Sequence, residues 1–242
     1  MLKRILDIFI AIFGLLISAP LVLPFILIIW LTDFKNPFYM SNRVGKNGKL
    51  FKLIKLRTMK VNADKKGIDS TSLNDPRITK IGHFIRKTKM DELPQLINVL
   101  TGSMSLVGPR PNVKTETDIY TDVEKELLTV KPGITDISST VFSDLAEILK
   151  NSKNPNLDYN QLVRPWKSRL GIIYVKKMGI FLDFKIIGIT IVNGISRKLS
   201  LKLITKLLIQ INAPEEVIEI SKRKSKLQPH PPPGANKIVL SR

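Results

Sequence analysis

Residues 86–111 read RKTKMDELPQLINVLTGSMSLVGPRP, and the rest of the chain is organised around this stretch. Two adjacent carboxylates, Asp91 and Glu92, stand where a helix is predicted to begin. Pro94 fits the first turn of that helix because the first backbone N–H groups have no intrahelical acceptor to lose. Gly102 is the expected stop. The apolar residues that follow at three- and four-residue spacing are Leu93, Leu96, Ile97 and Leu100.

Basic side chains flank the acidic pair. Arg86, Lys87 and Lys89 precede it, and Arg110 lies between two prolines that stiffen its loop. A helix start directs free N–H groups and a partial positive charge outward, which suits a carboxylate or a phosphate. The two acids can therefore serve as nucleophile, base or metal ligand. Taken alone, such a pair is also typical of an ordinary helix cap and dipole partner.

Composition limits the class of protein. A chain of 242 residues with 43% hydrophobic content can form one packed domain, or a domain with appendages. A net charge of +19 calls for an anionic partner, which is nucleic acid, an acidic membrane surface or a phosphorylated substrate. The lack of cysteine excludes disulfides and thiolate metal sites. Two histidines leave little material for a zinc site or a serine–histidine triad.

Residues 5–31 form an almost wholly apolar run, long enough for a transmembrane helix. Pro20 and Pro24 near its middle favour a kink, and Ser18 can hydrogen-bond to a carbonyl freed at the bend. Basic residues flank the run on both sides, so the positive-inside preference keeps both ends cytoplasmic, which a single straight span cannot do. On charge and proline alone, a spanning helix and a re-entrant helix that returns to the same face stand about even.

The charged residues on both sides of the apolar run at 5–31 suit a membrane surface. Residues 34–60 hold eight basic residues and no acid, and each such charge is worth about 1 kcal/mol near anionic lipid. By motif, Lys55 and Arg57 are the best placed of them to reach a phosphate site. On the other flank, Asp7 is expected to pair locally with the two basic residues one turn before it, near the lipid headgroups.

The remaining pattern predicts short elements around this centre. Residues 37–59 read as extended pieces joined by a turn at 44–49, and 62–76 as a polar loop that can act as a lid. Helices are expected at 77–88, 118–128, 143–150 and 159–175, with a turn at 131–133 and a loop at 151–160. Residues 181–195 are predicted to lie on the membrane or against the core, and 199–211 to form an interfacial or docked amphipathic helix. The basic, proline-rich tail from Ser221 is expected to be disordered or extended.

Five segments resemble, in order, the bacterial sugar transferase family, the monotopic polyprenyl-phosphate phosphoglycosyltransferases. They are LKRILDIFIAIFGLLISAP, NRVGKNGKLFKLIKLRTM, DPRITKIGHFIRKTKMDELPQLINVLTGSMSLVGPRP, VKPGIT and a weaker FLDFKII. The resemblance covers most of residues 2–187. Its DELPQL and SMSLVGPRP blocks, at this spacing, are highly specific.

The resemblance implies an enzyme that moves a sugar 1-phosphate from a UDP-sugar to polyprenyl (undecaprenyl) phosphate and releases UMP, the first membrane step of surface polysaccharide or glycoconjugate assembly. It implies that Asp91 is the nucleophile, which forms a covalent aspartyl phosphosugar, and that Glu92 helps to hold Mg²⁺. The expected partners are the UDP-sugar, the polyprenyl phosphate and anionic membrane lipid, with no nucleic acid. The basic residues expected to bind substrate phosphate are Lys55, Arg57, Arg77, Arg86 and Arg110.

The implied fold is mainly α with small β elements, an α/β domain seated by amphipathic helices on the cytoplasmic face of the bacterial inner membrane. The family's re-entrant helix breaks at a Ser-Pro, which favours the re-entrant topology here, with the bend at Ser18 and Pro20. The expected division is a membrane hairpin at 1–31, a catalytic domain at 32–195, and an amphipathic helix with a basic, proline-rich tail at 196–242.

Two departures from the family pattern matter. Ala19 stands where the family usually has the serine of Ser-Pro, and residues 136–139 (DISS) replace the usual Gly-Trp-Ala-Gln after VKPGIT. That second region bears on the sugar nucleotide, so the resemblance does not assign the donor. One alternative is a non-catalytic, membrane-tethered basic scaffold or nucleic-acid-binding protein, although its Lys and Arg are not interleaved with aromatic residues as a strand-binding surface requires. Another is a relative whose chemistry is lost or changed.

Overall fold

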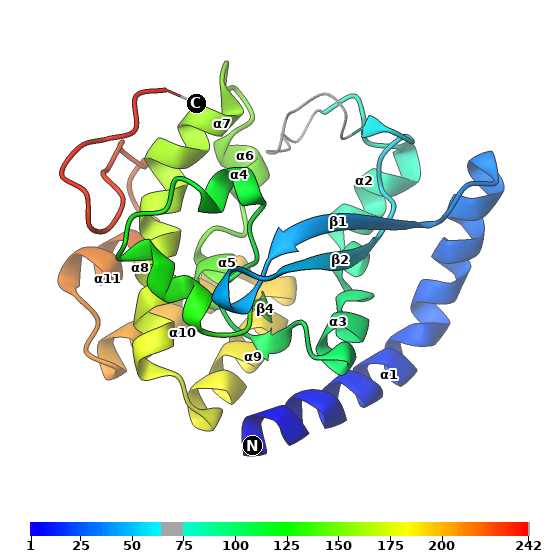
Figure 1. The fold of residues 1–242 in the computed structure, drawn as a ribbon, viewed down its shortest axis with the longest axis horizontal. Helices are drawn as coiled ribbons and strands as arrows, with labels where there is room; N and C mark the ends of the chain where they lie inside the picture. Colours follow the sequence, from blue (N-terminus) through cyan, green and yellow to red (C-terminus); the bar gives the residue numbers. More distant parts are fainter. Residues whose placement is uncertain (64–74, 242) are drawn as a thin grey trace.

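A computed structural model describes residues 1–63 and 75–241 of the chain. Within them the fold is mainly helical with two small two-stranded sheets, as the sequence predicts (Figure 1). The predicted lid falls for the most part on residues 64–74, which lie outside the described residues.

Helix α1 (Leu2–Asp33) forms one edge of the molecule and carries Pro20 and Pro24 in its interior. Figure 1 shows it as a curved helix. The hydroxyl of Ser18 donates to the carbonyl of Leu15 at 3.4 Å, one residue before the carbonyl that Pro20 leaves without its usual donor. Of the helices in residues 1–63 and 75–241, α1 is the one whose length and composition suffice to cross a membrane.

Strands β1 (Phe38–Val44) and β2 (Leu50–Leu56) pair antiparallel, which confirms the predicted extended pieces. The turn between them contains a short 3₁₀ helix, η1 (Lys46–Gly48), in which Asn47 has a left-handed backbone with φ of 56°. Asparagine and glycine tolerate that conformation, so the Lys-Asn-Gly sequence explains where the chain reverses.

The acidic pair lies in a 3₁₀ turn, η3 (Met90–Glu92), rather than at the start of a regular helix. Helix α3 (Gln95–Thr101) begins only after Pro94, because proline has no N–H with which to continue the hydrogen-bond ladder back into the turn. The predicted helix start is therefore wrong by about one turn. Gly102 ends α3 with φ of 85°, as predicted.

Helix α2 (Lys80–Lys87) precedes this turn and lies within the predicted helix at 77–88. The hydroxyl of Thr79 caps it by accepting the backbone N–H of Gly82 at 3.0 Å. Lys89 then takes a left-handed conformation, with φ of 59°, which turns the chain into η3.

Strands β3 (Ser105–Val107) and β4 (Gly133–Thr135) pair in parallel and join the VGPRP and KPGIT segments. A Cβ placed on Gly133 would lie only 2.1 Å from the backbone nitrogen of Gly108, so this approach requires glycine. The predicted turn at 131–133 is wrong at its last residue, which belongs to β4. The pairing fixes the loop of Arg110 beside the residues that follow β4.

The second half of the chain is a series of mostly short helices. The predicted helix at 118–128 is wrong, because Thr121 and Glu124 form a reciprocal capping box that starts η4 only at Glu124. The predicted helix at 159–175 begins instead as the π-helical turn η5 and continues as α8, with Pro165 tolerated in its first turn. The elements are α4 (Lys114–Thr117), η4 (Glu124–Thr129), α5 (Ile137–Val141), α6 (Leu145–Ile148), α7 (Pro155–Asp158), η5 (Tyr159–Val163), α8 (Arg164–Lys177), α9 (Ile180–Ile195), α10 (Arg197–Gln210) and α11 (Glu215–Ser221).

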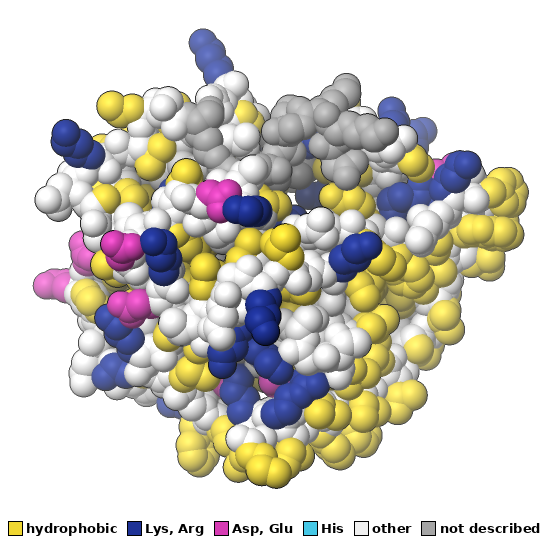
Figure 2. Space-filling view, in the orientation of Figure 1, with side chains coloured by type: hydrophobic (Ala, Val, Ile, Leu, Met, Phe, Trp, Pro, Cys, Tyr) yellow, Lys and Arg dark blue, Asp and Glu magenta, His cyan; other side chains and the backbone are white. Residues whose placement is uncertain are grey.

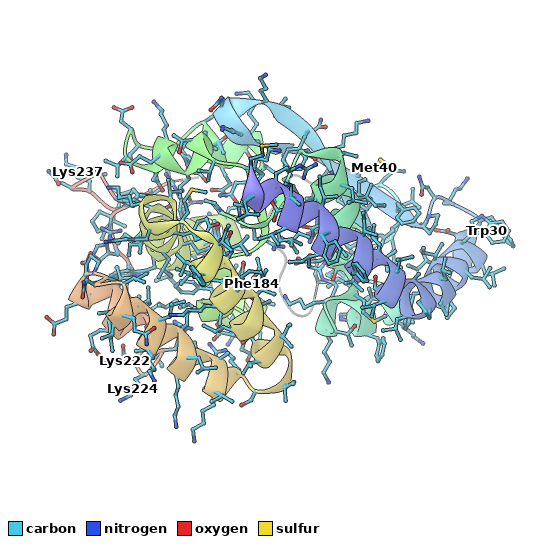
Figure 3. The ribbon with its side chains drawn as sticks, turned by 90° about the horizontal axis from the view of Figure 1, so that it is seen from below. Trp30, Met40, Phe184, Lys222, Lys224 and Lys237 are labelled. Carbon is cyan, nitrogen blue, oxygen red and sulfur yellow. The ribbon has the colours of Figure 1, made fainter. Side chains whose placement is uncertain are left out.

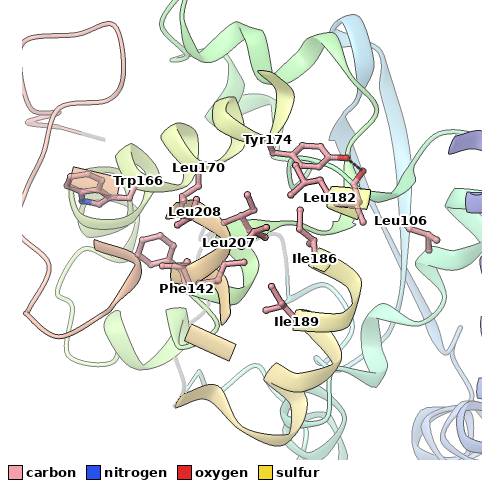
Figure 4. Packing of buried hydrophobic residues seen from close by; sticks show 14 of the residues in the cluster. Leu106, Phe142, Trp166, Leu170, Tyr174, Leu182, Ile186, Ile189, Leu207 and Leu208 are labelled. Carbon is pink, nitrogen blue, oxygen red and sulfur yellow. Dashed lines mark hydrogen bonds between the residues drawn. The ribbon is translucent and has the colours of Figure 1, made fainter. Parts of the chain in front are cut away.

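One hydrophobic core joins all three predicted parts of the chain. Figure 4 shows side chains of α8, α9 and α10 meeting in it, among them Leu170, Ile186 and Leu208, all fully buried. Ala11 of α1 belongs to the same core. Helix α10 is therefore docked on the protein, and of the two readings of its amphipathic pattern the docked helix is the one observed.

The tail after α11 is extended and packs against α8 and η5. The ring of His230 lies 4.5 Å from that of Trp166, and the backbone N–H of His230 donates to the carbonyl of Gln161 at 3.0 Å. The guanidinium of Arg169 donates to the carbonyl of Pro231 at 3.1 Å. These contacts supply hydrogen-bond partners to backbone groups of a proline-rich segment that forms no regular secondary structure.

Candidate active site

Basic side chains contact both members of the acidic pair. Strand β2 carries Lys55, whose Nζ lies 2.9 Å from Oε1 of Glu92 and 3.6 Å from Oδ2 of Asp91. Arg110 grips Glu92 with both guanidinium nitrogens, one of them at 3.3 Å from Oε2. The side chains of Asp91 and Glu92 are only 10% and 16% exposed. Two of the predicted phosphate-binding residues, Lys55 and Arg110, thus meet the predicted catalytic pair.

The positive charges next to Glu92 keep its carboxylate ionised. Burial alone would raise the pKa of its carboxyl, but the charges of Arg110 and Lys55 outweigh burial and hold that pKa well below its usual range. Reciprocally, the charge of Glu92 raises the pKa of Arg110. The result is an ionised carboxylate that is anchored on two cations, next to a second carboxylate whose ion pair within the described residues is with Lys55 at 3.6 Å.

Three predicted phosphate-binding residues lie elsewhere in this structure. Arg57 pairs with Asp33 at the end of α1, with one guanidinium nitrogen 2.7 Å from the carboxylate. Arg77 pairs with Asp75 at 2.6 Å, and Arg86 lies within 3.4 Å of the hydroxyl of Thr58. None of these described contacts is with Asp91 or Glu92.

Two further charged residues near Arg110 escaped the sequence prediction. Asp136 caps α5, accepting the backbone N–H of Ser139 at 2.6 Å, and its charge raises the pKa of Arg110. Lys167 on α8 places its ammonium 5.6 Å from the ring centre of Tyr159. The sequence signal for Asp136 was its departure from the family pattern. Lys167 gave no signal, because a lysine on a helix is usually solvated.

The acidic residues fit a magnesium ion that keeps most of its ligand shell from water or phosphate. No group of three acidic or histidine residues able to hold a metal occurs in residues 1–63 and 75–241. Mg²⁺ is commonly bound through one or two carboxylates plus substrate phosphates, and Asp91 with Glu92 supplies that set. In this structure Glu92 is held by Lys55 and Arg110, so a metal there would share its carboxylate with them.

Polar contacts tie the start of α1 to the strand that leads into the site. Asp7 is buried and accepts the hydroxyl of Ser105 at 2.7 Å and the backbone N–H of Leu106 at 3.1 Å. Lys3 pairs with Asp183 of α9 at 2.6 Å. The predicted local pairing of Asp7 with its basic neighbours is therefore wrong, because a buried backbone N–H and hydroxyl of β3 compete for its oxygens and win.

The outer faces of α1 and α9 are apolar and exposed. Figure 3 shows both helices on one side of the molecule, with Trp30 and Phe184 on them. Phe181 and Ile195, at the two ends of α9, are each 86% exposed. Figure 2 shows apolar side chains along the edge that α1 forms, beside a face where Lys and Arg side chains gather. Contiguous apolar surface of this kind marks an interaction site, and a basic rim suits anionic lipid.

Comparison with known proteins gives the family. The family model described as Bacterial sugar transferase matches residues 1–197. Among similar proteins are "Galactosyl transferase CpsE" of Streptococcus agalactiae serotype III, 40% identical over 78% of this chain, and the "UDP-glucose:undecaprenyl-phosphate glucose-1-phosphate transferase" of Escherichia coli, 35% identical over 82%. The "Undecaprenyl-phosphate galactose phosphotransferase" of Salmonella typhimurium is 43% identical over 55% of the chain. The chain spans 41%, 41% and 31% of the length of these three relatives. With most of its length matched, this chain belongs to the bacterial sugar transferase family.

Proposed function

We propose that the protein transfers a sugar 1-phosphate from a UDP-sugar to undecaprenyl phosphate and releases UMP. The observation that carries this proposal is the buried Asp91–Glu92 pair held against Lys55 and Arg110, in a chain whose family match includes every one of these residues. Relatives are named for this kind of reaction, with glucose 1-phosphate in one case and galactose in another. The donor of this chain is left open, because residues 136–139, which begin with Asp136, differ from the usual sequence of the family in the region that bears on the sugar nucleotide.

The proposed chemistry proceeds in two displacements at phosphorus. A carboxylate oxygen of Asp91 attacks the phosphorus that carries the sugar, the bond from that phosphorus to the bridging oxygen breaks, and UMP leaves with the bond's electrons. A phosphate oxygen of the polyprenyl phosphate then attacks the aspartyl phosphosugar. Asp91 leaves as a free carboxylate, and the product is a polyprenyl diphosphate sugar.

The neighbouring side chains suit this chemistry. Asp91, with one cation at 3.6 Å, keeps a lone pair available for attack, whereas Glu92 is engaged by two cations. Arg110, with its planar fork of donors, matches phosphate oxygens and can transfer its grip from Glu92 to a substrate. Mg²⁺ at the acidic pair, when bound, would neutralise charge on the phosphates. Removal of Mg²⁺ by a chelator is expected to stop UMP release, and addition of Mg²⁺ is expected to restore it.

We further propose that α1 is re-entrant and seats the protein on the cytoplasmic face of the bacterial inner membrane. In favour of this, both ends of α1 bond to the same folded body: Lys3 to Asp183 at the start, and Asp33 to Arg57 at the end. A helix with its ends on opposite sides of a bilayer could not make both contacts with one body. In this cysteine-free chain, cysteines placed at residues 2 and 36 are expected to label from the same side, and labelling from opposite sides would contradict the re-entrant helix.

The enzymatic proposal is tested by UMP release. The protein, in detergent or nanodiscs with Mg²⁺ and undecaprenyl phosphate, is offered a panel of UDP-sugars. At least one donor is expected to give UMP, and the Asp91→Asn variant is expected to give none while remaining folded in membranes. Release at the parent rate by that variant would exclude Asp91 as nucleophile. No contact in the described residues favours the alternative of a basic scaffold or nucleic-acid-binding protein.

A further inference from the structure

We propose that Lys167 of α8 is a donor-binding residue, whose ammonium contacts the diphosphate of the UDP-sugar beside Arg110. This inference rests on the proposed function, because it takes the donor to be a nucleoside diphosphate. It adds a third cation to the two, Lys55 and Arg110, that already contact the acidic pair.

The packing of α8 places Lys167 near Arg110. A Cβ placed on Gly171 would lie 3.9 Å from the Cβ of Pro109, so this face of α8 packs against the segment that carries Arg110. Lys167 is four residues earlier on the same helix and therefore lies on the same face, one turn away. Its ammonium sits over the ring of the buried Tyr159.

Lys167 is a half-buried cation with no carboxylate partner among the described residues. In the part of the chain that the structure describes, no acidic oxygen lies within ion-pair distance of its Nζ, whereas Lys3, Lys55 and Arg164 each have one. Burial, reinforced by the charge of Arg110, lowers the pKa of Lys167 to about 8. A half-buried ammonium over an aromatic ring lacks the anion that would offset its partial loss of water.

The position along α8 favours the donor over the lipid acceptor. Tyr174, further along the helix, donates to Asp183 at 2.7 Å near the end of α1 that bears the apolar face. Lys167 is seven residues earlier, about 10 Å away along the helix axis. In Figure 1 the early part of α8 lies on the side away from α1. A ligand reached from that side is water-soluble, and the diphosphate is the anion that all UDP-sugars share.

The test uses UDP as the probe and the whole chain in detergent with Mg²⁺, with dissociation constants measured by calorimetry. Lys167→Met is expected to weaken UDP binding about tenfold, the size of one lost charge-assisted hydrogen bond. Lys167→Arg keeps the charge and is expected to stay within about twofold. The matched control is Lys177→Met, which removes an exposed lysine of the same helix and is expected to change nothing.

A pH series separates charge from structure. UDP affinity of the parent is expected to fall between pH 7 and pH 9 as the ammonium loses its proton, and to fall less in Lys167→Arg. The charged and titratable groups that face Lys167 are Lys89 and Glu92 of η3, Arg110, Asp136 and Tyr159. Each is present in both proteins, so the difference between the two profiles belongs to residue 167.

Several results would overturn the inference. They are unchanged UDP binding in Lys167→Met, an equal loss in Lys167→Arg, or an effect confined to the KM of undecaprenyl phosphate, which would assign the lysine to the acceptor. Thermal unfolding of each variant shows whether it is folded. If the parent itself binds no UDP, it is the proposed donor class that fails, and this result is distinct from a failure of the Lys167 variant alone.

Discussion

Replacing Asp7 by alanine tests how α1 is fastened to the active site. Asp7 is 6% exposed, and its carboxylate accepts two hydrogen bonds from β3, the strand that leads to Arg110. The hydroxyl of Ser105 can rotate toward another acceptor, whereas Asp7 is the acceptor of the Leu106 N–H among the described residues. Leaving such a buried donor unpaired costs about 1–3 kcal/mol, and losing a hydrogen bond to a charged group costs about 1.5–3 kcal/mol.

The structure therefore predicts that Asp7→Ala lowers the free energy of unfolding by about 3 kcal/mol. For a chain of this size that corresponds to a fall in Tm of about 6–12 °C. The fluorescence of Trp166, in the core, reports unfolding in nanodiscs. The control is Asp122→Ala, which removes a carboxylate whose side chain is 96% exposed and is expected to change the Tm by no more than about 1 °C.

A double-mutant cycle isolates the contact. If Asp7 and Ser105 interact as described, the loss in Asp7→Ala combined with Ser105→Ala is smaller than the sum of the single losses by about 1–2 kcal/mol. A Tm for Asp7→Ala equal to that of the control, or strict additivity in the cycle, would refute the link between α1 and β3.

Three more perturbations have expected outcomes. Glu124→Ala leaves a buried arginine of α8 without its carboxylate partner and is expected to cost about 3–5 kcal/mol in unfolding experiments. Glu126→Ala, which removes a side chain that is 38% exposed, is expected to cost less than about 1 kcal/mol; equal losses would contradict the buried ion pair. Arg110→Ala is expected to lower kcat/KM for UMP release about 10²–10³-fold, while Arg57→Ala, which is bonded to α1, changes it less than tenfold; the reverse order would show that the arginines are misassigned. Because the pKa of Glu92 is held low, its ionised form stabilises the folded protein fully above its usual pKa of about 4.3. The stability gap between the parent and Glu92→Gln should therefore shrink as the pH falls from 5 to 3, and a gap that widens would be inconsistent with the ion pairs.

The sequence predicts the elements whose boundaries are set by local chemistry. The β1–β2 hairpin follows from an Asn-Gly turn between extended pieces, and α3 ends at Gly102 because glycine accepts a left-handed backbone. The length of α1 follows from its apolar run. These are rules that act within a few residues, so a single sequence is enough to apply them.

Elements fixed by tertiary contacts could not be predicted. The β3–β4 pairing joins residues nearly thirty apart in sequence and depends on Gly133 meeting Gly108, which no local pattern shows. The helix expected at 118–128 fails because Glu124 is drawn into a buried network with Arg164 and Ser168. Tertiary burial there outweighs helix propensity.

The site shows the same division. Asp91, Glu92 and the prolines around Arg110 all lie within residues 86–111, so their motif could be seen directly. Lys55 lies in a segment that resembles the family, so it could be predicted. Lys167 comes near Arg110 only because α8 packs against Pro109. Arg57 also lies in a segment that resembles the family, but it forms an ion pair with Asp33. Only the path of α1 brings that partner near.

The central claim is that Asp91 carries the phosphosugar between a soluble donor and a lipid acceptor. It is tested most directly by incubating the folded protein with Mg²⁺ and its accepted UDP-sugar without acceptor, followed by quenching and peptide mass spectrometry. The expected result is a mass increase of one sugar phosphate on the peptide that contains Asp91, which disappears when undecaprenyl phosphate is added. Unmodified Asp91, in protein shown to turn over that donor once the acceptor is present, would contradict it.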